Sequence, residues 1–182
     1  MREHAHILTR LGAEAVRVRR PDELATVQAL VIPGGESSVM DKLTRAFGLQ
    51  HPLRDAIAAG LPVYGTCAGL IMLADRITDA IEGQQTLGGL DVTVRRNAFG
   101  SQVESFEIDL DVPAVGVRPV RAVFIRAPRV EHVGPGVESI AALPDGSVVA
   151  VRAGNLIATS FHPEMNGETR FHALLLEMAQ RR

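Results

Sequence analysis

The chain contains a single cysteine, Cys67, among its 182 residues. One cysteine excludes an internal disulfide framework, a CxxC redox pair and a cysteine-rich zinc site, so no metal centre is expected. A lone thiol is typical of a reducing compartment, which favours the cytoplasm.

Long hydrophobic runs and an excess of one charge are missing as well. No uninterrupted apolar stretch approaches the ~20 residues of a membrane-spanning helix, and the N-terminus contains no signal-peptide core. With 19 basic and 21 acidic residues, the formal net charge is -2. Proteins that bind nucleic acid through phosphate contacts normally carry a basic excess. Neither a membrane nor a nucleic acid is therefore an expected partner.

The composition is that of a globular domain. Apolar residues make up 46% and charged residues 22% of the chain, which excludes a disordered protein. The front half alternates expected helices with short apolar strands: helices at 2–11, 38–47, 51–59 and 70–74, and strands at 15–18, 29–32 and 61–64. The back half is rich in expected strands, at 91–94, 106–110, 121–125, 147–151 and 155–159, and ends in a helix at 168–180. This order predicts a single α/β domain over residues 1–182.

Cys67 lies at the centre of a Gly-x-Cys-x-Gly segment between an expected strand and an expected helix. A strand-to-helix turn this sharp needs small flanking residues, and it holds the central side chain at the carboxyl edge of the sheet. The start of a helix favours the thiolate form of such a side chain. The backbone amide of Ala68 would point to where an oxyanion forms. Taken alone, the segment is equally consistent with an inert buried cysteine.

His162 and Glu164 belong to a Phe-His-Pro-Glu segment after the last expected strand. A histidine at a strand end can face the same edge as Cys67 and act as its general base. Glu164, two residues further on, leans to the same side in an extended chain. Its carboxylate could orient the imidazole as the acid of a triad does. Taken alone, this tetrapeptide is more often a surface turn.

The segment Pro-Gly-Gly-Glu-Ser at 33–37 also follows an apolar strand and precedes a helix. Gly34 and Gly35 let the backbone approach a ligand closely and expose its amides. This arrangement suits a phosphate cradle or half of an oxyanion hole, although the segment lacks the spacing and the lysine of a P-loop. The alternative is a plain turn before a helix capped by Ser37.

The three segments are far more specific together than apart. Each follows an expected strand, and open α/β sheets bind their ligands at the carboxyl ends of strands. A nucleophile, a His-x-Glu pair and an amide loop are the parts of a Cys-His-Glu acyl-transfer site.

The motifs resemble those of the triad class I glutamine amidotransferases, which combine Gly-Thr-Cys-Ala-Gly with Phe-His-Pro-Glu. The chain looks most similar to the glutaminase subunits of pyridoxal 5'-phosphate synthase, from Arg2 to the C-terminal helix. That resemblance is carried by Pro-Gly-Gly-Glu-Ser at 33–37, Arg-Asn-Ala-Phe-Gly at 96–100, Glu-Ser-Phe-Glu at 104–107, Phe-Ile-Arg-Ala-Pro at 124–128 and Ser-Phe-His-Pro-Glu at 160–164.

The resemblance implies a three-layer sandwich, with a mostly parallel central sheet flanked by helices. It implies hydrolysis of L-glutamine to glutamate and ammonia without a cofactor. Cys67 would attack the side-chain amide and form a glutamyl thioester, His162 would move the proton, and Glu164 would orient His162. The ammonia would pass to a synthase subunit, in a large hetero-oligomer that makes pyridoxal 5'-phosphate (vitamin B6). In this family the glutaminase is poorly active until that partner docks.

The same resemblance implies which residues contact glutamine and its oxyanion. The expected substrate contacts are Gly34, Gly35, Glu36, Arg96, Ile125 and Arg126. The amides of Gly35 and Ala68 are the expected oxyanion donors. An arginine beside an amino-acid carboxylate also makes chemical sense, because the two form paired charge-assisted hydrogen bonds.

The sequence departs from the family pattern in two places. Family members begin with a strand and a Leu-Gln-Gly loop ahead of the segment that starts here at Arg2, so the chain is expected to lack the family's first strand. Residues 100–103 replace a more basic family segment. Three alternatives stay open: a glutaminase that feeds a different synthase, a non-hydrolytic relative of the same fold, and a truncated, catalytically incompetent form.

Overall fold

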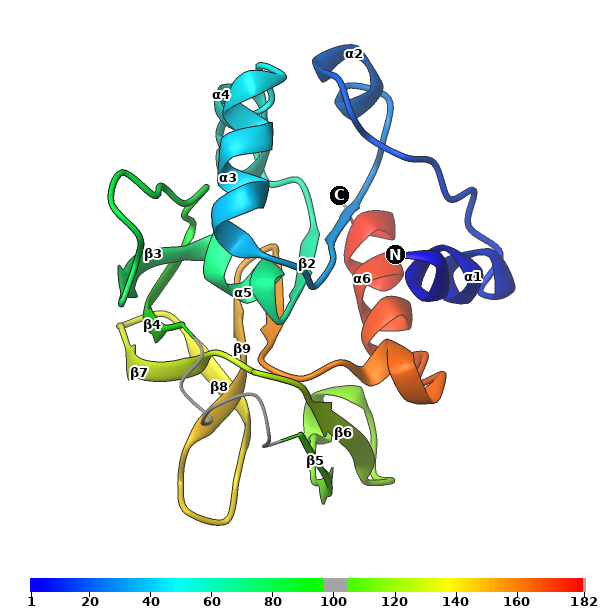
Figure 1. Cartoon of the computed structure of the whole chain (residues 1–182). Helices are drawn as coiled ribbons and strands as arrows, with labels where there is room; N and C mark the ends of the chain where they lie inside the picture. Colours follow the sequence, from blue (N-terminus) through cyan, green and yellow to red (C-terminus); the bar gives the residue numbers. More distant parts are fainter. Residues whose placement is uncertain (97–104, 182) are drawn as a thin grey trace.

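The computed structural model describes residues 1–96 and 105–181 (Figure 1). The motif residues 97–100 and residue 104, and the unusual segment 100–103, lie outside the described residues. The helices are α1 (Arg2–Arg10), α2 (Pro21–Leu24), α3 (Ser37–Ala46), α4 (Gln50–Ala58), α5 (Ala68–Leu73) and α6 (Arg170–Gln180), with 3-10 helices η1 (Pro113–Val115) and η2 (Pro163–Asn166). The strands are β1 (Leu30–Ile32), β2 (Val63–Thr66), β3 (Ala74–Thr78), β4 (Leu90–Arg95), β5 (Phe106–Leu110), β6 (Val120–Phe124), β7 (Arg129–Val133), β8 (Glu138–Ala142), β9 (Val148–Ala153) and β10 (Leu156–Thr159).

The central sheet has the strand order β1-β2-β10-β9-β8. β1, β2 and β10 are parallel neighbours, whereas β9 and β8 join antiparallel. Two of the four neighbour pairings are thus parallel and two antiparallel, and four of the five strands (β1, β2, β10 and β8) run in the same direction. Short turns connect β8, β9 and β10, and antiparallel pairing is the arrangement that short turns allow. The expected α/β fold with a central sheet and flanking helices is confirmed.

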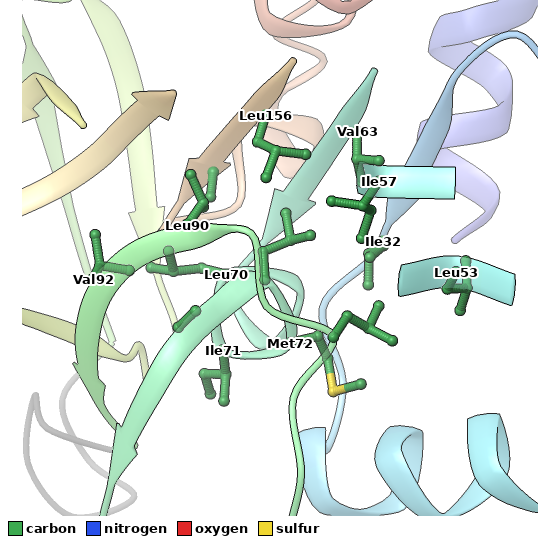
Figure 2. Close-up of a cluster of buried hydrophobic side chains, with 14 of the residues drawn as sticks. Ile32, Leu53, Ile57, Val63, Leu70, Ile71, Met72, Leu90, Val92 and Leu156 are labelled. Atoms are coloured by element: carbon green, nitrogen blue, oxygen red, sulfur yellow. The ribbon is translucent and has the colours of Figure 1, made fainter. Parts of the chain in front are cut away.

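Apolar side chains alternate between the two faces of this sheet. Val63 and Leu156 belong to a cluster with α4, α5 and the sheet β3-β4-β7. Figure 2 shows this cluster around Leu70 and Leu90. Tyr64 and Ile157 point the other way, into a second cluster with α6 and the β5-β6 hairpin. Two cores on opposite faces of one sheet give the molecule its three layers.

Most predicted elements are found within two residues of their expected bounds. The strand expected at 15–18 is wrong, because residues 13–19 form no strand or helix. An open cavity of about 1060 Å³ is lined by residues 15–18 and by β1, the edge strand of the sheet. An alternating segment becomes a strand only when it can pair with another, and across this cavity residues 15–18 are not paired with β1.

The structure also contains strands that the sequence analysis did not predict, namely β3, β7 and β8. β3 follows α5 directly, with no turn residue to mark the change. In the described part of the chain, no helix is long and apolar enough to span a membrane.

Candidate active site

The site residues come from three loops that leave the parallel part of the central sheet. Residues 33–36 follow β1, Cys67 follows β2, and His162 and Glu164 follow β10. Parallel neighbours end at one edge of a sheet, so these loops converge there. The structure therefore brings together the three segments that the sequence analysis singled out.

The Cys67 turn is sharp and held from both sides. Cys67 has φ 49 and ψ -103 and is the N-cap of α5. Its N–H donates to the Thr159 carbonyl of β10 at 2.8 Å. A Cβ at Gly69 would overlap the carbonyl oxygen of Ile32, so only glycine lets α5 pass this close to β1. Cys67 thus occupies a left-handed conformation that its surroundings impose.

His162 lies between a thiol and a carboxylate. Its Nδ1 is 2.8 Å from Glu164 Oε1, and the Cys67 side chain is the other group that acts on its ring. The His162 N–H donates to the Val123 carbonyl of β6 at 2.8 Å, which fixes the backbone of this loop. Glu164 lies in η2 and is buried.

The charges of His162 and Glu164 stabilise each other. Burial alone would lower the pKa of His162, but interactions with the Cys67 and Glu164 side chains outweigh it and raise that pKa to about 10. Burial would raise the pKa of Glu164, but hydrogen bonds from His162 and His4 lower it to about 2. At neutral pH the pair is therefore an imidazolium and a carboxylate, and His162 holds a proton that it can donate.

Gly34 and Glu36 lie between His162 and Arg96. A Cβ at Gly34 would overlap the His162 ring, so this glycine backbone lies against the imidazole. Glu36, not Ser37, is the N-cap of α3, because its carboxylate accepts from the Ser38 N–H at 3.3 Å. The same Glu36 oxygen lies 2.7 Å from Arg96 Nη2. The position of Gly35 between Gly34 and Glu36 places its amide in this loop.

Ile125 and Arg126 follow β6, whose Val123 carbonyl holds the His162 backbone. Both side chains are exposed, and Arg126 has a positive φ of 45. Ala68 is the first residue of α5. An amide in the first turn of a helix has no intrahelical acceptor, so the Ala68 N–H is available to a ligand. Among the described residues, no group of three or more His, Cys, Asp or Glu side chains is placed to hold a metal ion.

Two buried histidines near Glu164 were not predicted from the sequence. His4 Nε2 lies 3.4 Å from Glu164 Oε1, and His4 Nδ1 lies 2.8 Å from His172 Nε2. The sequence does hold a signal for His4, since it precedes the apolar residues Ile7, Leu8 and Leu11 at helical spacing. A histidine within an apolar stripe is a candidate for burial.

Comparisons with known proteins agree with this geometry. The SNO glutamine amidotransferase family matches residues 1–181. A pyridoxal 5'-phosphate synthase subunit PdxT of Leifsonia xyli subsp. xyli is 68% identical over 176 residues, covering 97% of this chain and 89% of the relative. The PdxT subunit of Acidothermus cellulolyticus is 58% identical over 182 residues, covering 98% of this chain and 88% of the relative.

A solved structure described as a glutamine amidotransferase superposes with a TM-score of 0.91 at 46% identity, covering 98% of this chain and 93% of that one. The match extends over nearly the whole chain and includes the loops that carry the site. This chain is a member of the SNO glutamine amidotransferase family.

Proposed function

We propose that this chain hydrolyses L-glutamine to glutamate and ammonia and supplies the ammonia to a synthase subunit that makes pyridoxal 5'-phosphate. One observation carries the proposal: at the carboxyl edge of the sheet, His162 interacts with the Cys67 side chain and its Nδ1 lies 2.8 Å from Glu164 Oε1. Relatives of 58% to 68% identity that are named pyridoxal 5'-phosphate synthase subunits support the choice of pathway.

The first half of the proposed reaction forms a thioester. The Cys67 thiolate attacks the carboxamide carbon of glutamine, and the carbonyl oxygen becomes an oxyanion. The amides of Ala68 and Gly35 are the proposed donors to that oxygen. Because Nδ1 of His162 faces Glu164, Nε2 is the nitrogen that exchanges protons with the reacting groups. His162 passes its proton to the departing nitrogen, the C–N bond breaks, and ammonia leaves.

The second half restores the enzyme. Neutral His162 takes a proton from water as the water attacks the thioester carbon. The C–S bond then breaks, glutamate leaves, and the Cys67 thiolate is left beside the His162 imidazolium. Glu164 stays ionised throughout and stabilises that imidazolium, as the acid of a triad does.

Glutamine itself is proposed to lie between the loop 34–36 and two arginines. Arg96, with a side chain that is only 10% exposed, and Arg126 would bind the α-carboxylate through charge-assisted hydrogen bonds. Ile125 and the backbone of Gly34 and Gly35 would complete the pocket. Glu36 already pairs with Arg96 at 2.7 Å and so fixes the position of that guanidinium.

The chain is proposed to act as one glutaminase domain within a larger hetero-oligomer. A free thiol as nucleophile needs a reducing environment, and this favours the cytoplasm as the compartment. The ammonia would reach the synthase subunit within the complex.

The proposal is tested by measuring glutamate release from glutamine by this chain, with and without a pyridoxal 5'-phosphate synthase subunit. We expect release that rises sharply when the partner is added. Release with no response to the partner would point to a different synthase. A folded chain that releases no glutamate in either condition would contradict the proposed activity.

Gly34→Ala is expected to lower kcat strongly while leaving the fold intact. The added methyl group overlaps the His162 ring, and the ring can move away only by weakening its bond to Glu164. Displacement of a catalytic group by about 1 Å costs on the order of 10²-fold in rate. Steady-state kinetics and a thermal unfolding curve check this. A variant with the wild-type kcat would contradict this prediction, because it would show that the added methyl group does not disturb His162.

A further inference from the structure

His4 joins a second set of buried side chains to the triad. The residue is only 4% exposed and lies in α1. Its Nε2 is 3.4 Å from Glu164 Oε1, the same oxygen that lies 2.8 Å from His162 Nδ1. One carboxylate oxygen thus sits between two imidazoles that come from opposite ends of the sequence.

The His4 ring is fixed by further contacts. Its Nδ1 is 2.8 Å from Nε2 of His172, a fully buried residue of α6. His172 in turn packs edge-on against Tyr64, with ring centroids 5.4 Å apart. Thr66 Oγ1 of β2 lies 3.3 Å from His4 Nε2. Both nitrogens of His4 are therefore engaged, and its orientation follows from the fold.

The position of one hydrogen decides whether His4 can bond to Glu164. An ionised carboxylate only accepts hydrogen bonds, so a hydrogen bond between the two requires a hydrogen on Nε2 of His4. Burial, followed by the effect of His4, lowers the pKa of His172 to about 4, which keeps His172 neutral at pH 7. A neutral His172 can share one hydrogen with His4 Nδ1, whichever of the two rings donates it.

We propose that His4 is a positioning residue of the triad, which donates from Nε2 to Glu164 and fixes the carboxylate that orients His162. Glu164 Oε2 has no hydrogen-bond partner among the described residues. The contacts to Oε1 are then what holds the carboxylate in place. The kinetic part of this inference rests on the proposed glutaminase activity, whereas the role of His4 at Glu164 can be measured without it.

Other titratable groups face His4 and its neighbours, and their charges bear on how this part of the molecule responds to pH. Besides Glu164, His162 and His172, they are Tyr64 of β2 and Glu168. Burial raises the pKa of Tyr64, so it stays neutral. Burial opposes the ionisation of Glu168, but hydrogen bonds from Arg170 outweigh it and lower its pKa, so Glu168 is charged at neutral pH. Neither group changes its charge between pH 5 and 8, the range in which histidines usually titrate.

Two substitutions at this position separate the role at Glu164 from packing. The amide nitrogen of glutamine can take the place of Nε2, so His4→Gln keeps a donor for Glu164. The shorter His4→Asn can place its amide only near Nδ1, so it loses that donor and keeps a polar group facing His172. His6→Ala is the matched control, because His6 is an exposed histidine on the same helix.

The first readout is the rate at which iodoacetamide alkylates Cys67, followed against pH. The chain has one cysteine, so the signal reports on Cys67 alone and needs neither glutamine nor a partner. In His4→Asn, Glu164 loses a donor that lowers its pKa, so this carboxylate is protonated at higher pH. A protonated Glu164 no longer stabilises the His162 imidazolium beside the Cys67 thiolate. The acidic limb of the alkylation profile is then expected to move to higher pH, whereas His4→Gln and His6→Ala keep the wild-type limb.

The second readout is the glutaminase assay with the synthase partner present. We expect His4→Asn to lower kcat about tenfold or more, the factor for one lost hydrogen bond to a charged group, with KM unchanged. A residue that only packs would lower thermal stability and leave the alkylation limb in place, and that outcome would overturn the proposal. If wild-type protein releases no glutamate, the proposed function fails, while the alkylation profiles still decide the role of His4.

A measurement on the wild-type protein covers the case in which His4→Asn does not fold. Nitrogen-15 NMR of the histidine rings distinguishes a protonated ring nitrogen from a bare one. His4 Nε2 is expected to carry hydrogen at pH 7. A bare Nε2 could not donate to Glu164 and would refute the inference.

Discussion

Cys67→Ala is expected to abolish glutamate release, with a loss of at least about 10⁴-fold. The thiol is the only group in the proposed mechanism that bonds to the carboxamide carbon, so no thioester forms without it. The fold should survive, because alanine removes one buried sulfur and leaves intact the backbone bond from residue 67 to the Thr159 carbonyl. Glutamate release and thermal unfolding of the purified variant check both parts.

Cys67→Ser is the matched variant for this test. It keeps the size and polarity of the side chain but presents a hydroxyl, which ionises far less readily than a thiol. It should be nearly as inactive as Cys67→Ala, which would show that the loss comes from the chemistry of sulfur and not from a cavity. Residual turnover near the wild-type rate in either variant would remove Cys67 from the role of nucleophile.

Glu164→Gln is expected to lower kcat on the order of 10⁴-fold while the protein stays folded, by analogy with the triad acid of serine proteases. Glu164 uses one oxygen, Oε1, for both His162 and His4, and the glutamine carbonyl can occupy that position. The substitution then removes the charge and keeps the shape. His162 loses the carboxylate that helps to raise its pKa, so fewer molecules hold the proton that the leaving nitrogen needs.

The charge of Glu164 also makes a pH-dependent contribution to stability. Its pKa is lowered to about 2 in the folded protein from an ordinary value of 4.5. The stabilisation is therefore present above pH 4.5 and is lost as the pH falls toward 2. In acid unfolding experiments, the free energy of unfolding should fall less with decreasing pH for Glu164→Gln than for the wild type. Glu168→Gln, four residues further on, is the control for kcat only, because the pKa of Glu168 is lowered as well. An unchanged kcat in Glu164→Gln would make Glu164 a bystander.

The sequence locates the proposed catalytic groups because each depends on a local pattern. Cys67 is marked by small residues between a strand and a helix, and His162 by its place after the last strand. The parallel pairing of β1, β2 and β10 brings these strand ends together, as a βα-alternating sequence predicts. Sequence spacing alone does not define contacts between distant segments. His4 and His172 lie 168 positions apart, and their contact depends on how α1 and α6 pack.

Two local mispredictions have the same physical origin. Residues 15–18 have the alternation of a strand, but strand formation depends on a partner, and the structure has a cavity between them and β1. β3 is the converse case, a segment that does find a partner. It pairs with β4, and this pairing ends α5 at Leu73, although residues 74–78 contain no glycine or proline that would mark the end of a helix. In both cases tertiary contacts decide what the local pattern leaves open.

At Cys67, the residue that would make the protein more stable differs from the residue that the proposed activity needs, because Cys67 has a positive φ. A non-glycine side chain in such a conformation costs about 1–3 kcal/mol, and glycine would adopt it more easily. The substitution that relaxes this turn would therefore also delete the thiol. Stabilising substitutions are easy to find in natural proteins, and their usual cost is lost activity where a strained residue is needed for function. At position 67, only the proposed reaction of the thiol opposes such a substitution. In a chain that had lost its activity, no other requirement would retain a cysteine at this position.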